Sequence, residues 1–208
     1  MIRTITLARE YGTGGGEIAQ RVARRLGWDL IDRSLIDQIS EKFHVSPRAA
    51  RELDGRGTWW LERIARAVWL ETGGTTVDVA DAENIHEFTR NAILEASYRG
   101  KCVIVGRGGQ CVLRDRPDVL HVFLFAPLEY RLERLRRQYA SEKELLKAVA
   151  RVDEERSAYI REFHDTEWKD PLLYHLWINA KIGIEAVTEL IVNTAKAPSL
   201  LNQEIRHG

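Results

Sequence analysis

Short apolar runs alternate with amphipathic stretches along the chain. The runs lie at residues 4–8, 29–32, 101–105, 118–125 and 174–178, and most are continuous rather than alternating with polar residues. Continuous apolar runs of this length are typical of parallel strands that are covered on both faces. The pattern therefore predicts a parallel sheet of five strands.

The stretches between these runs have the periodicity of helices. In residues 17–26, Ile18, Val22 and Leu26 lie four apart on one face, and Gly27 follows as a C-cap. Further helices are predicted over residues 34–43, 58–71, 83–98, 128–139, 142–163 and 184–194, with one more beginning at Ser46-Pro47 and a loop over residues 72–81. Strands that alternate with helices predict an α/β fold of three layers.

Two helical stretches interrupt the order of strands. One, within an insertion of about residues 38–98, separates the second strand from the third, and the other, about residues 137–170, separates the fourth from the fifth. A length of 208 residues suits one domain. We therefore expect a single domain over residues 1–208, with a helical insertion and a helical excursion.

Charge and composition exclude several classes of protein. Lysine plus arginine number 31 and aspartate plus glutamate number 31, so a general nucleic-acid partner is not expected. The apolar runs are too short to span a bilayer, and the chain begins without an apolar signal core. Cys102 and Cys111 are expected to be reduced thiols of a cytoplasmic protein, with a disulfide or half a metal site as the alternative.

A glycine-rich loop follows the first strand. The sequence REYGTGGG occupies residues 9–16 and leads directly into a helix. Four glycines in five positions let the backbone turn sharply and direct several N–H groups to one point, and the helix adds its positive end. This favours phosphate binding over a plain connecting turn. The candidate phosphate-binding residues are Arg9, Gly12, Thr13, Gly14, Gly15 and Gly16.

Two nucleotide-binding motifs fit this loop in part. In the frame GxxxxGK[ST], Gly14 matches the second glycine, while Gly15 stands at the lysine and Gly16 at the hydroxyl residue. In the dinucleotide frame GxGxxG, Gly12 and Gly14 match, and Asp32 lies where an acid would bind the ribose. The loop alone leaves both frames open.

Charged residues follow the next two strands. Asp32 and Arg33 come after the second strand, and Arg107 stands between glycines after the third. A guanidinium on such a backbone suits a phosphate, although a helix cap or a structural ion pair would also account for these residues. Later, the series Arg131, Arg134, Arg137 and the series Arg151, Arg156, Arg161 lie on charged helices. They fit solvated faces with pairs such as Arg151–Glu155, or a lid whose arginines close over phosphates.

The segment AREYGTGGGEIA, residues 8–19, resembles the opening of the cytidylate kinase-like proteins. That branch of the P-loop nucleoside monophosphate kinases typically has a strand, REYGSGG, an arginine and EIA. The resemblance covers nearly the whole chain, through LGWDLIDR (26–33), VIVGRGG (103–109), VLHVFLFAPLEYR (119–131), WKDP (168–171) and YHLWIN (174–179).

The resemblance implies a P-loop kinase-type fold with a monophosphate-binding insertion and a lid. It implies ATP with Mg²⁺ as donor and a pyrimidine nucleotide such as CMP as acceptor. By position, the loop glycines would hold donor phosphates, Arg107 would contact the acceptor phosphate, and Asp32 and Arg33 would lie on the acceptor side. Arg151 and Arg156, with Asp153 nearby, resemble the lid set of that family, and Asp153 is expected to bind the acceptor substrate together with Asp32, Arg33 and Arg107.

The chain departs from the family at the loop. Ordinary monophosphate kinases have lysine where this chain has Gly15 and threonine where it has Glu17, and the branch usually has arginine at the position of Gly16. For a kinase, Arg9 or a lid arginine would have to supply the missing charge, and Glu17 is a candidate to hold Mg²⁺ through water. The alternatives are a non-catalytic nucleotide-binding or regulatory protein with a degenerate P-loop, and a dinucleotide-dependent oxidoreductase.

A tryptophan-rich helix over residues 58–71 is expected to pack in the core, or to form a homo-oligomer interface if exposed.

Overall fold

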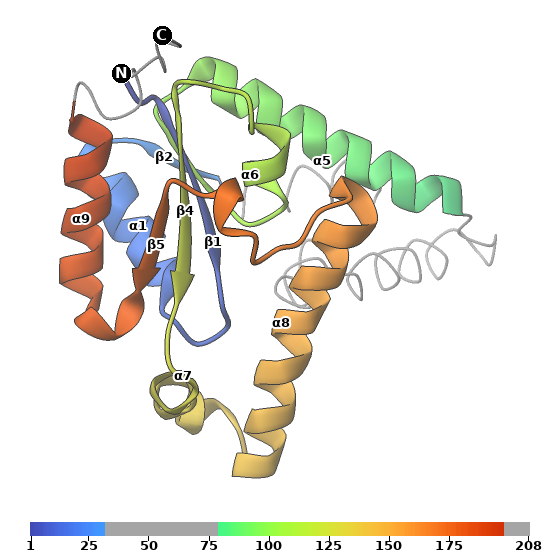
Figure 1. Ribbon diagram of the computed structural model, residues 1–208, viewed down its shortest axis with the longest axis vertical. Coiled ribbons are helices and arrows are strands. Elements are labelled where there is room, and N and C mark those ends of the chain that lie inside the picture. Colours follow the sequence, from blue (N-terminus) through green and yellow to red (C-terminus); the bar gives the residue numbers. More distant parts are fainter. Residues whose placement is uncertain (32–78, 198–208) are drawn as a thin grey trace, which may run out of the picture.

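The computed structural model of the chain describes residues 1–31 and 79–197. Its centre is a parallel sheet in the order β2-β3-β1-β4-β5 (Figure 1). The strands are β1 (Thr4–Arg9), β2 (Asp29–Ile31), β3 (Cys102–Val105), β4 (Val119–Phe125) and β5 (Leu176–Asn179). All five predicted strands are therefore confirmed, and the fold is α/β as expected.

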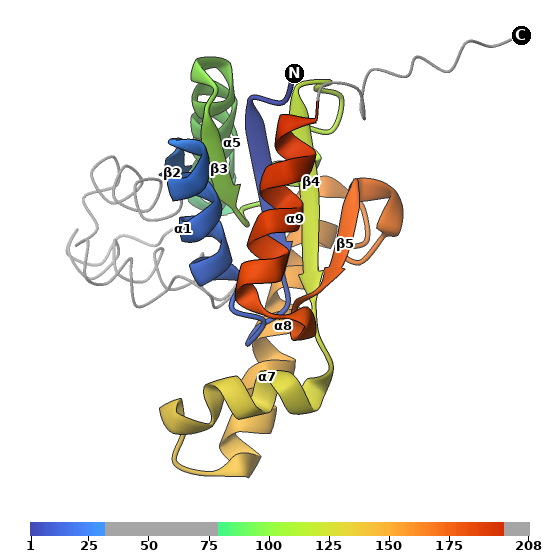
Figure 2. The same cartoon turned by 90° about the vertical axis from the view of Figure 1, so that its left-hand side faces the viewer.

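Helices cover both faces of the sheet. They are α1 (Gly15–Leu26), α5 (Val79–Arg99), α6 (Gly109–Val112), α7 (Leu128–Leu135), α8 (Glu142–His164) and α9 (Ile184–Lys196), with 3₁₀ turns η1 (Arg136–Gln138), η2 (Pro171–Leu173) and η3 (Ala180–Ile182). Helices α1 and α9 lie on one face, and α5 and α6 lie on the other (Figures 1 and 2). No helix among residues 1–31 and 79–197 is long and apolar enough to cross a membrane.

The apolar runs form the core because neighbouring strand residues point to opposite faces. Ile5 and Leu7 of β1 are fully buried in the cluster that α1 and α9 share with the sheet. On the other face, Ile104 of β3 packs with Ile93 of α5 in a second cluster. Both faces of the central strands are thus covered, which explains their continuous apolar sequence.

Several predicted boundaries are wrong by a few residues. Helix α5 begins at Val79 inside the predicted loop, where alanines and an early aspartate favour a helix start. The helix expected over residues 128–139 ends at Leu135 and continues as η1. Strand β5 begins at Leu176, later than expected, because η2 and the bond from Tyr174 Oη to the Trp168 carbonyl hold the preceding residues. The short helix α6 was not expected at all.

Other predictions are confirmed or lie outside the described residues. Gly27 ends α1 in the left-handed region, as expected for a C-cap. Neither Cys102 nor Cys111 forms a disulfide. The helices expected at 34–43, at 58–71 and from Ser46 lie outside the described residues. So do Asp32 and Arg33.

The carboxyl ends of the strands meet at one edge of the sheet, and α7 lies beyond that edge (Figure 2). The glycine-rich loop between β1 and α1 reaches the same edge. This is the edge at which parallel α/β sheets bind ligands. It is where we build the candidate site.

Candidate functional site

The loop between β1 and α1 leaves the start of α1 without a side-chain cap. Its N-cap residue, Gly14, has a φ of 79° and makes no side-chain hydrogen bond to the first turn. Gly12 also lies in the left-handed region, with a φ of 88°. The first amide groups of a helix have no partner within the helix, so an uncapped start attracts anions. The loop therefore has the backbone geometry of a phosphate cradle.

Close neighbours explain three of the four glycines. A Cβ on Gly14 would lie 2.7 Å from Ile184 Cδ1 and 2.9 Å from Arg134 Nη2. A Cβ on Gly12 would meet the α7 backbone at 2.9 Å, and one on Gly15 would lie 2.7 Å from Arg9 Cγ. Gly16 differs, because no atom lies within 4 Å of its Cβ position. A side chain would fit at Gly16 alone among these four.

Arginines from other elements line the hollow beside the loop. The hollow has a volume of about 330 Å³ and is bounded by residues 9–16 together with Arg134, Leu135, Gln138 and Arg156. Arg9 ends β1, Arg134 lies on α7, and Arg156 lies on α8. The positive charge that the glycine run lacks is therefore supplied from three separate elements.

Arg134 reaches the loop from α7. Its Nη2 lies 3.4 Å from Glu17 Oε2 on the first turn of α1, and close to Gly14. Glu17 is also paired with Arg21 at 2.9 Å. The sequence placed Arg134 in a series with Arg131 and Arg137, but the spacing did not show which member faces the loop. The signal that could have found it is its position one turn and a half into the helix that follows β4.

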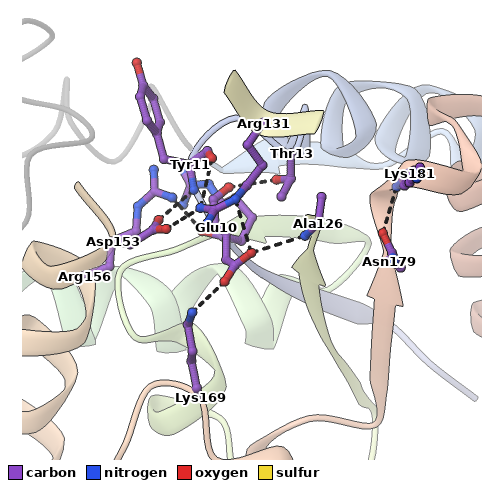
Figure 3. Close-up of polar contacts among 11 residues, drawn as sticks. Glu10, Tyr11, Thr13, Ala126, Arg131, Asp153, Arg156, Lys169, Asn179 and Lys181 are labelled. Carbon is purple, nitrogen blue, oxygen red and sulfur yellow. Dashed lines mark hydrogen bonds and ion pairs between the residues drawn. The ribbon is translucent and has the colours of Figure 1, made fainter. Parts of the chain in front are cut away.

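Two α8 residues hold the main chain of the loop. Arg156 Nη1 donates to the Arg9 carbonyl at 2.5 Å, and the Tyr11 N–H donates to Asp153 Oδ1 at 2.7 Å (Figure 3). Asp153 also pairs with Arg131 of α7. Asp153 was expected on the acceptor side. In this structure the loop engages it, so a contact with an acceptor would require these bonds to break.

A buried carboxylate lies at the centre of this arrangement. The Glu10 side chain is 9% exposed, accepts from Lys169 Nζ at 2.5 Å through Oε1, and accepts from the Ala126 N–H at 3.2 Å through Oε2 (Figure 3). Arg131 Nε lies 3.6 Å from the same Oε2. The sequence did not predict roles for Glu10 or Lys169, although they stand in the REYG and WKDP segments, and it placed Arg131 only in a series of solvated or lid arginines.

The remaining predicted arginines lie elsewhere. Arg107 follows β3 with a φ of 60°. Burial raises the pKa of Tyr159 on α8, and the positive charge of Arg107 opposes this increase. Arg151 pairs with Glu155 at 3.4 Å, which confirms the expected i,i+4 pair. Neither Arg107 nor Arg151 is among the described residues that line the hollow. Their substrate roles stay predictions.

An aromatic cluster joins α5 to the end of α8. His86 stacks on Phe163 at 4.4 Å between ring centroids, and its Nδ1 lies 3.2 Å from Tyr159 Oη. Burial lowers the pKa of His164, which meets His86 edge-on, to about 4. These imidazoles are therefore neutral near pH 7. The cluster ties the end of the expected insertion to the expected lid.

The site offers little to a metal ion by itself. Within residues 1–31 and 79–197, no three histidine, cysteine, aspartate or glutamate side chains group in a way that could hold a metal. Glu17 stands beside the loop, and its two oxygens are paired with Arg21 and Arg134. A magnesium ion here would depend on phosphate and water oxygens, as Mg²⁺ bound with a nucleotide commonly does.

Comparison with known proteins agrees with this geometry. A family model described as the cytidylate kinase-like family matches residues 4–182. The chain belongs to the cytidylate kinase-like family. No curated protein sequence matches the chain of this family member.

Solved structures support the same fold. An uncharacterized protein from Eubacterium ventriosum is 19% identical, with 95% of this chain and 99% of that chain covered and a TM-score of 0.66. Shikimate kinase from Bacteroides thetaiotaomicron is also 19% identical, with 95% and 100% covered and a TM-score of 0.54. The fold is thus of the P-loop kinase type. Its strand order differs from the 3-2-1-4-5-6 order typical of dinucleotide-binding folds, which argues against an oxidoreductase.

Proposed function

We propose that this family member is an ATP-dependent kinase that phosphorylates a nucleoside monophosphate, with a pyrimidine nucleotide such as CMP as the expected acceptor. The observation that carries the proposal is the uncapped start of α1, which opens on a hollow lined by Arg9, Arg134 and Arg156. Main-chain amides and guanidinium groups at one point suit a chain of phosphates. Membership of a kinase-like family supports this assignment.

Phosphoryl transfer requires positioning and positive charge rather than a protein nucleophile. An oxygen of the acceptor phosphate attacks the γ-phosphorus in line, the bond to the β–γ bridging oxygen breaks, and ADP leaves. The loop amides would hold the donor phosphates, and Arg134 and Arg156 would stabilise the charge that develops. Arg107, at the end of the neighbouring strand β3, would contact the acceptor phosphate, with Asp32 and Arg33 on the same side. Arg151 would act as a lid residue.

Magnesium would accompany ATP. Glu17 is the candidate to reach it, through a water molecule, because its carboxylate stands on the first turn of α1 beside the loop. The ion would neutralise charge on the donor phosphates. If a bound nucleotide replaced the contact between Glu17 and Arg134, both side chains would still lie near the phosphates.

A transfer assay with a panel of acceptors tests the proposal. The purified full chain is incubated with ATP, MgCl₂ and one of CMP, dCMP, UMP, AMP or shikimate, the last because a structural neighbour is a shikimate kinase. Formation of ADP and of the phosphorylated product is followed by anion-exchange chromatography. We expect turnover with a pyrimidine monophosphate in preference to the other acceptors.

One observation favours a second function. Gly15 and Gly16 stand where related loops have lysine and arginine, so the glycine run, residues 12–16, has no cation. The alternative is a nucleotide-binding or regulatory protein that does not transfer phosphate. ATP binding in a calorimeter without transfer to any acceptor would support this alternative and refute the kinase.

The cellular setting belongs to the same proposal. We propose a cytoplasmic protein with reduced thiols and without a nucleic-acid or membrane partner. Burial raises the pKa of Cys102, and raises the pKa of Cys111 to about 11, so both thiols stay protonated near neutral pH. Homo-oligomer formation through residues 58–71 remains a prediction, because that segment lies outside the described residues.

A further inference from the structure

The α7–α8 segment, residues 127–169, leaves the sheet after β4 and returns just before η2. Both of its ends are bonded to one carboxylate. Glu10 Oε2 accepts from the Ala126 N–H, immediately before the segment begins, and Glu10 Oε1 accepts from Lys169 Nζ, where it ends (Figure 3). Glu10, which lies in the glycine-rich loop, therefore contacts both ends of the segment.

The contacts continue from Glu10 into the segment itself. Arg131 of α7 lies between Glu10 Oε2, at 3.6 Å, and the carboxylate of Asp153 on α8. Asp153 in turn accepts the Tyr11 N–H, next to Glu10 in the chain. Four side chains are thus in contact in the order Lys169, Glu10, Arg131, Asp153, and their charges alternate along this order. We call these four side chains the hinge network.

Burial makes the hinge network costly to break. The side chains of Glu10, Arg131 and Asp153 are 9%, 11% and 14% exposed, whereas that of Lys169 is 52% exposed. A buried charge that loses its partner is strongly destabilised, so each member restricts the positions of the others. The network therefore favours one orientation of α7 and α8 relative to the loop.

We propose that the hinge network positions the α7–α8 segment so that Arg134 and Arg156 stand over the donor loop, an inference that rests on the proposed kinase function. Both arginines lie on this segment, and both line the hollow. Arg156 also donates to the carbonyl of Arg9, the residue before Glu10, whereas Asp153 accepts from the N–H of Tyr11, the residue after Glu10. Glu10, Arg131, Asp153 and Lys169 act through the arginines and are positioning residues.

This role predicts a division between binding and catalysis. The loop amides, which would bind ATP in the ground state, belong to the connection between β1 and α1 and are not carried on the segment. The arginines stabilise charge that develops in transfer, which requires accurate placement. Loss of a positioning residue should therefore lower kcat while the Kd for ATP changes little.

Lys169→Met is the informative variant, because Lys169 is half exposed and its replacement endangers folding least. We expect kcat to fall about tenfold while the Kd for ATP stays within about twofold. Lys169→Arg should restore most of the rate, because it keeps the charge near Glu10. The matched control is Lys147→Met, an exposed lysine on α8 outside the hinge network, which should behave as the wild type.

Hydrogen exchange of the nucleotide-free protein gives a readout that does not need activity. Lys169→Met should speed exchange of the Tyr11 amide and of the α7 and α8 amides about fivefold relative to the wild type and to Lys147→Met. Unchanged exchange would overturn the hinge network, as would equal changes in kcat and in the Kd for ATP, or failure of Lys169→Arg to restore the wild-type values. If the wild type transfers no phosphate, the proposed function fails, and the exchange result still decides the network.

Discussion

Arg134→Ala removes a guanidinium that lies beside Gly14 and the first turn of α1. Its side chain is 33% exposed and pairs with Glu17 at 3.4 Å. An exposed pair of this kind contributes at most about 1 kcal/mol to folding, so the variant should remain folded. Loss of one cation beside the transferred phosphate should cost far more in the transition state. We expect kcat/KM for ATP to fall about 100-fold, which corresponds to about 2.7 kcal/mol.

The assay varies ATP at a saturating concentration of the acceptor, with urea unfolding to confirm that the free energy of unfolding is nearly unchanged. Arg136→Ala is the matched control. Arg136 lies in η1 on the same segment, is 70% exposed and pairs with Glu133 at 3.1 Å, away from the loop. Its replacement should leave the kinetics of ATP unchanged.

A folded Arg134→Ala protein with wild-type kcat/KM would refute the reasoning. It would mean that the charge needed at the loop comes from Arg9 or Arg156, or that no such charge is needed. Equal losses in the two variants would also refute it, because they would reflect a general effect on α7 and η1.

Three further predictions concern separate parts of the molecule. Gly16→Arg places a cation where no atom lies within 4 Å of the new Cβ, so the KM for ATP should fall or turnover should rise in the transfer assay, and an unchanged or lower rate in a folded variant would contradict this. Arg107→Ala should raise the KM of the acceptor about tenfold and that of ATP by less than about twofold, whereas equal effects would contradict its assigned role. Burial lowers the pKa of His121 to about 4 in the folded protein, whereas the same imidazole in the unfolded chain has a pKa near 6.5. The unfolded chain therefore binds the proton first as the pH falls from about 6.5 to 4, and the free energy of unfolding should decrease, by about 2 kcal/mol at pH 5. Urea unfolding of the wild type and of His121→Asn across this pH range checks the prediction. It would be contradicted if the free energy of unfolding depended equally on pH in the two proteins.

The fold could be predicted from the sequence because its signals are local. Ile18, Val22 and Leu26 on one helix face and the apolar run of β4 each reflect burial that the periodicity records directly. The start of α5 and the 3₁₀ turn after α7 could not be placed, because local patterns define the ends of elements poorly.

The candidate site likewise combines local features, which could be predicted from the sequence, with long-range contacts, which could not. The glycine loop and the Arg151–Glu155 pair are recorded in neighbouring residues, and the sequence predicted both. The bond from Tyr11 to Asp153 joins residues 142 positions apart, and that from Lys169 to Glu10 joins residues 159 apart. Pairs of this kind depend on how the sheet and α8 are assembled, which composition and spacing do not reveal. The contact of Asp153 with the loop was accordingly not predicted, and its acceptor role stays a prediction.

The most direct test of the phosphate cradle is titration of wild-type, Gly14→Ala and Gly27→Ala proteins with ATP and MgCl₂ in a calorimeter. Both glycines have a positive φ, so both substitutions strain the backbone by roughly 1–2 kcal/mol, but a Cβ at Gly27 meets no atom within 4 Å and lies at the far end of α1. We predict that the wild type and Gly27→Ala bind ATP and that Gly14→Ala does not. Equal affinity of the two variants, or no binding by the wild type, would contradict the account.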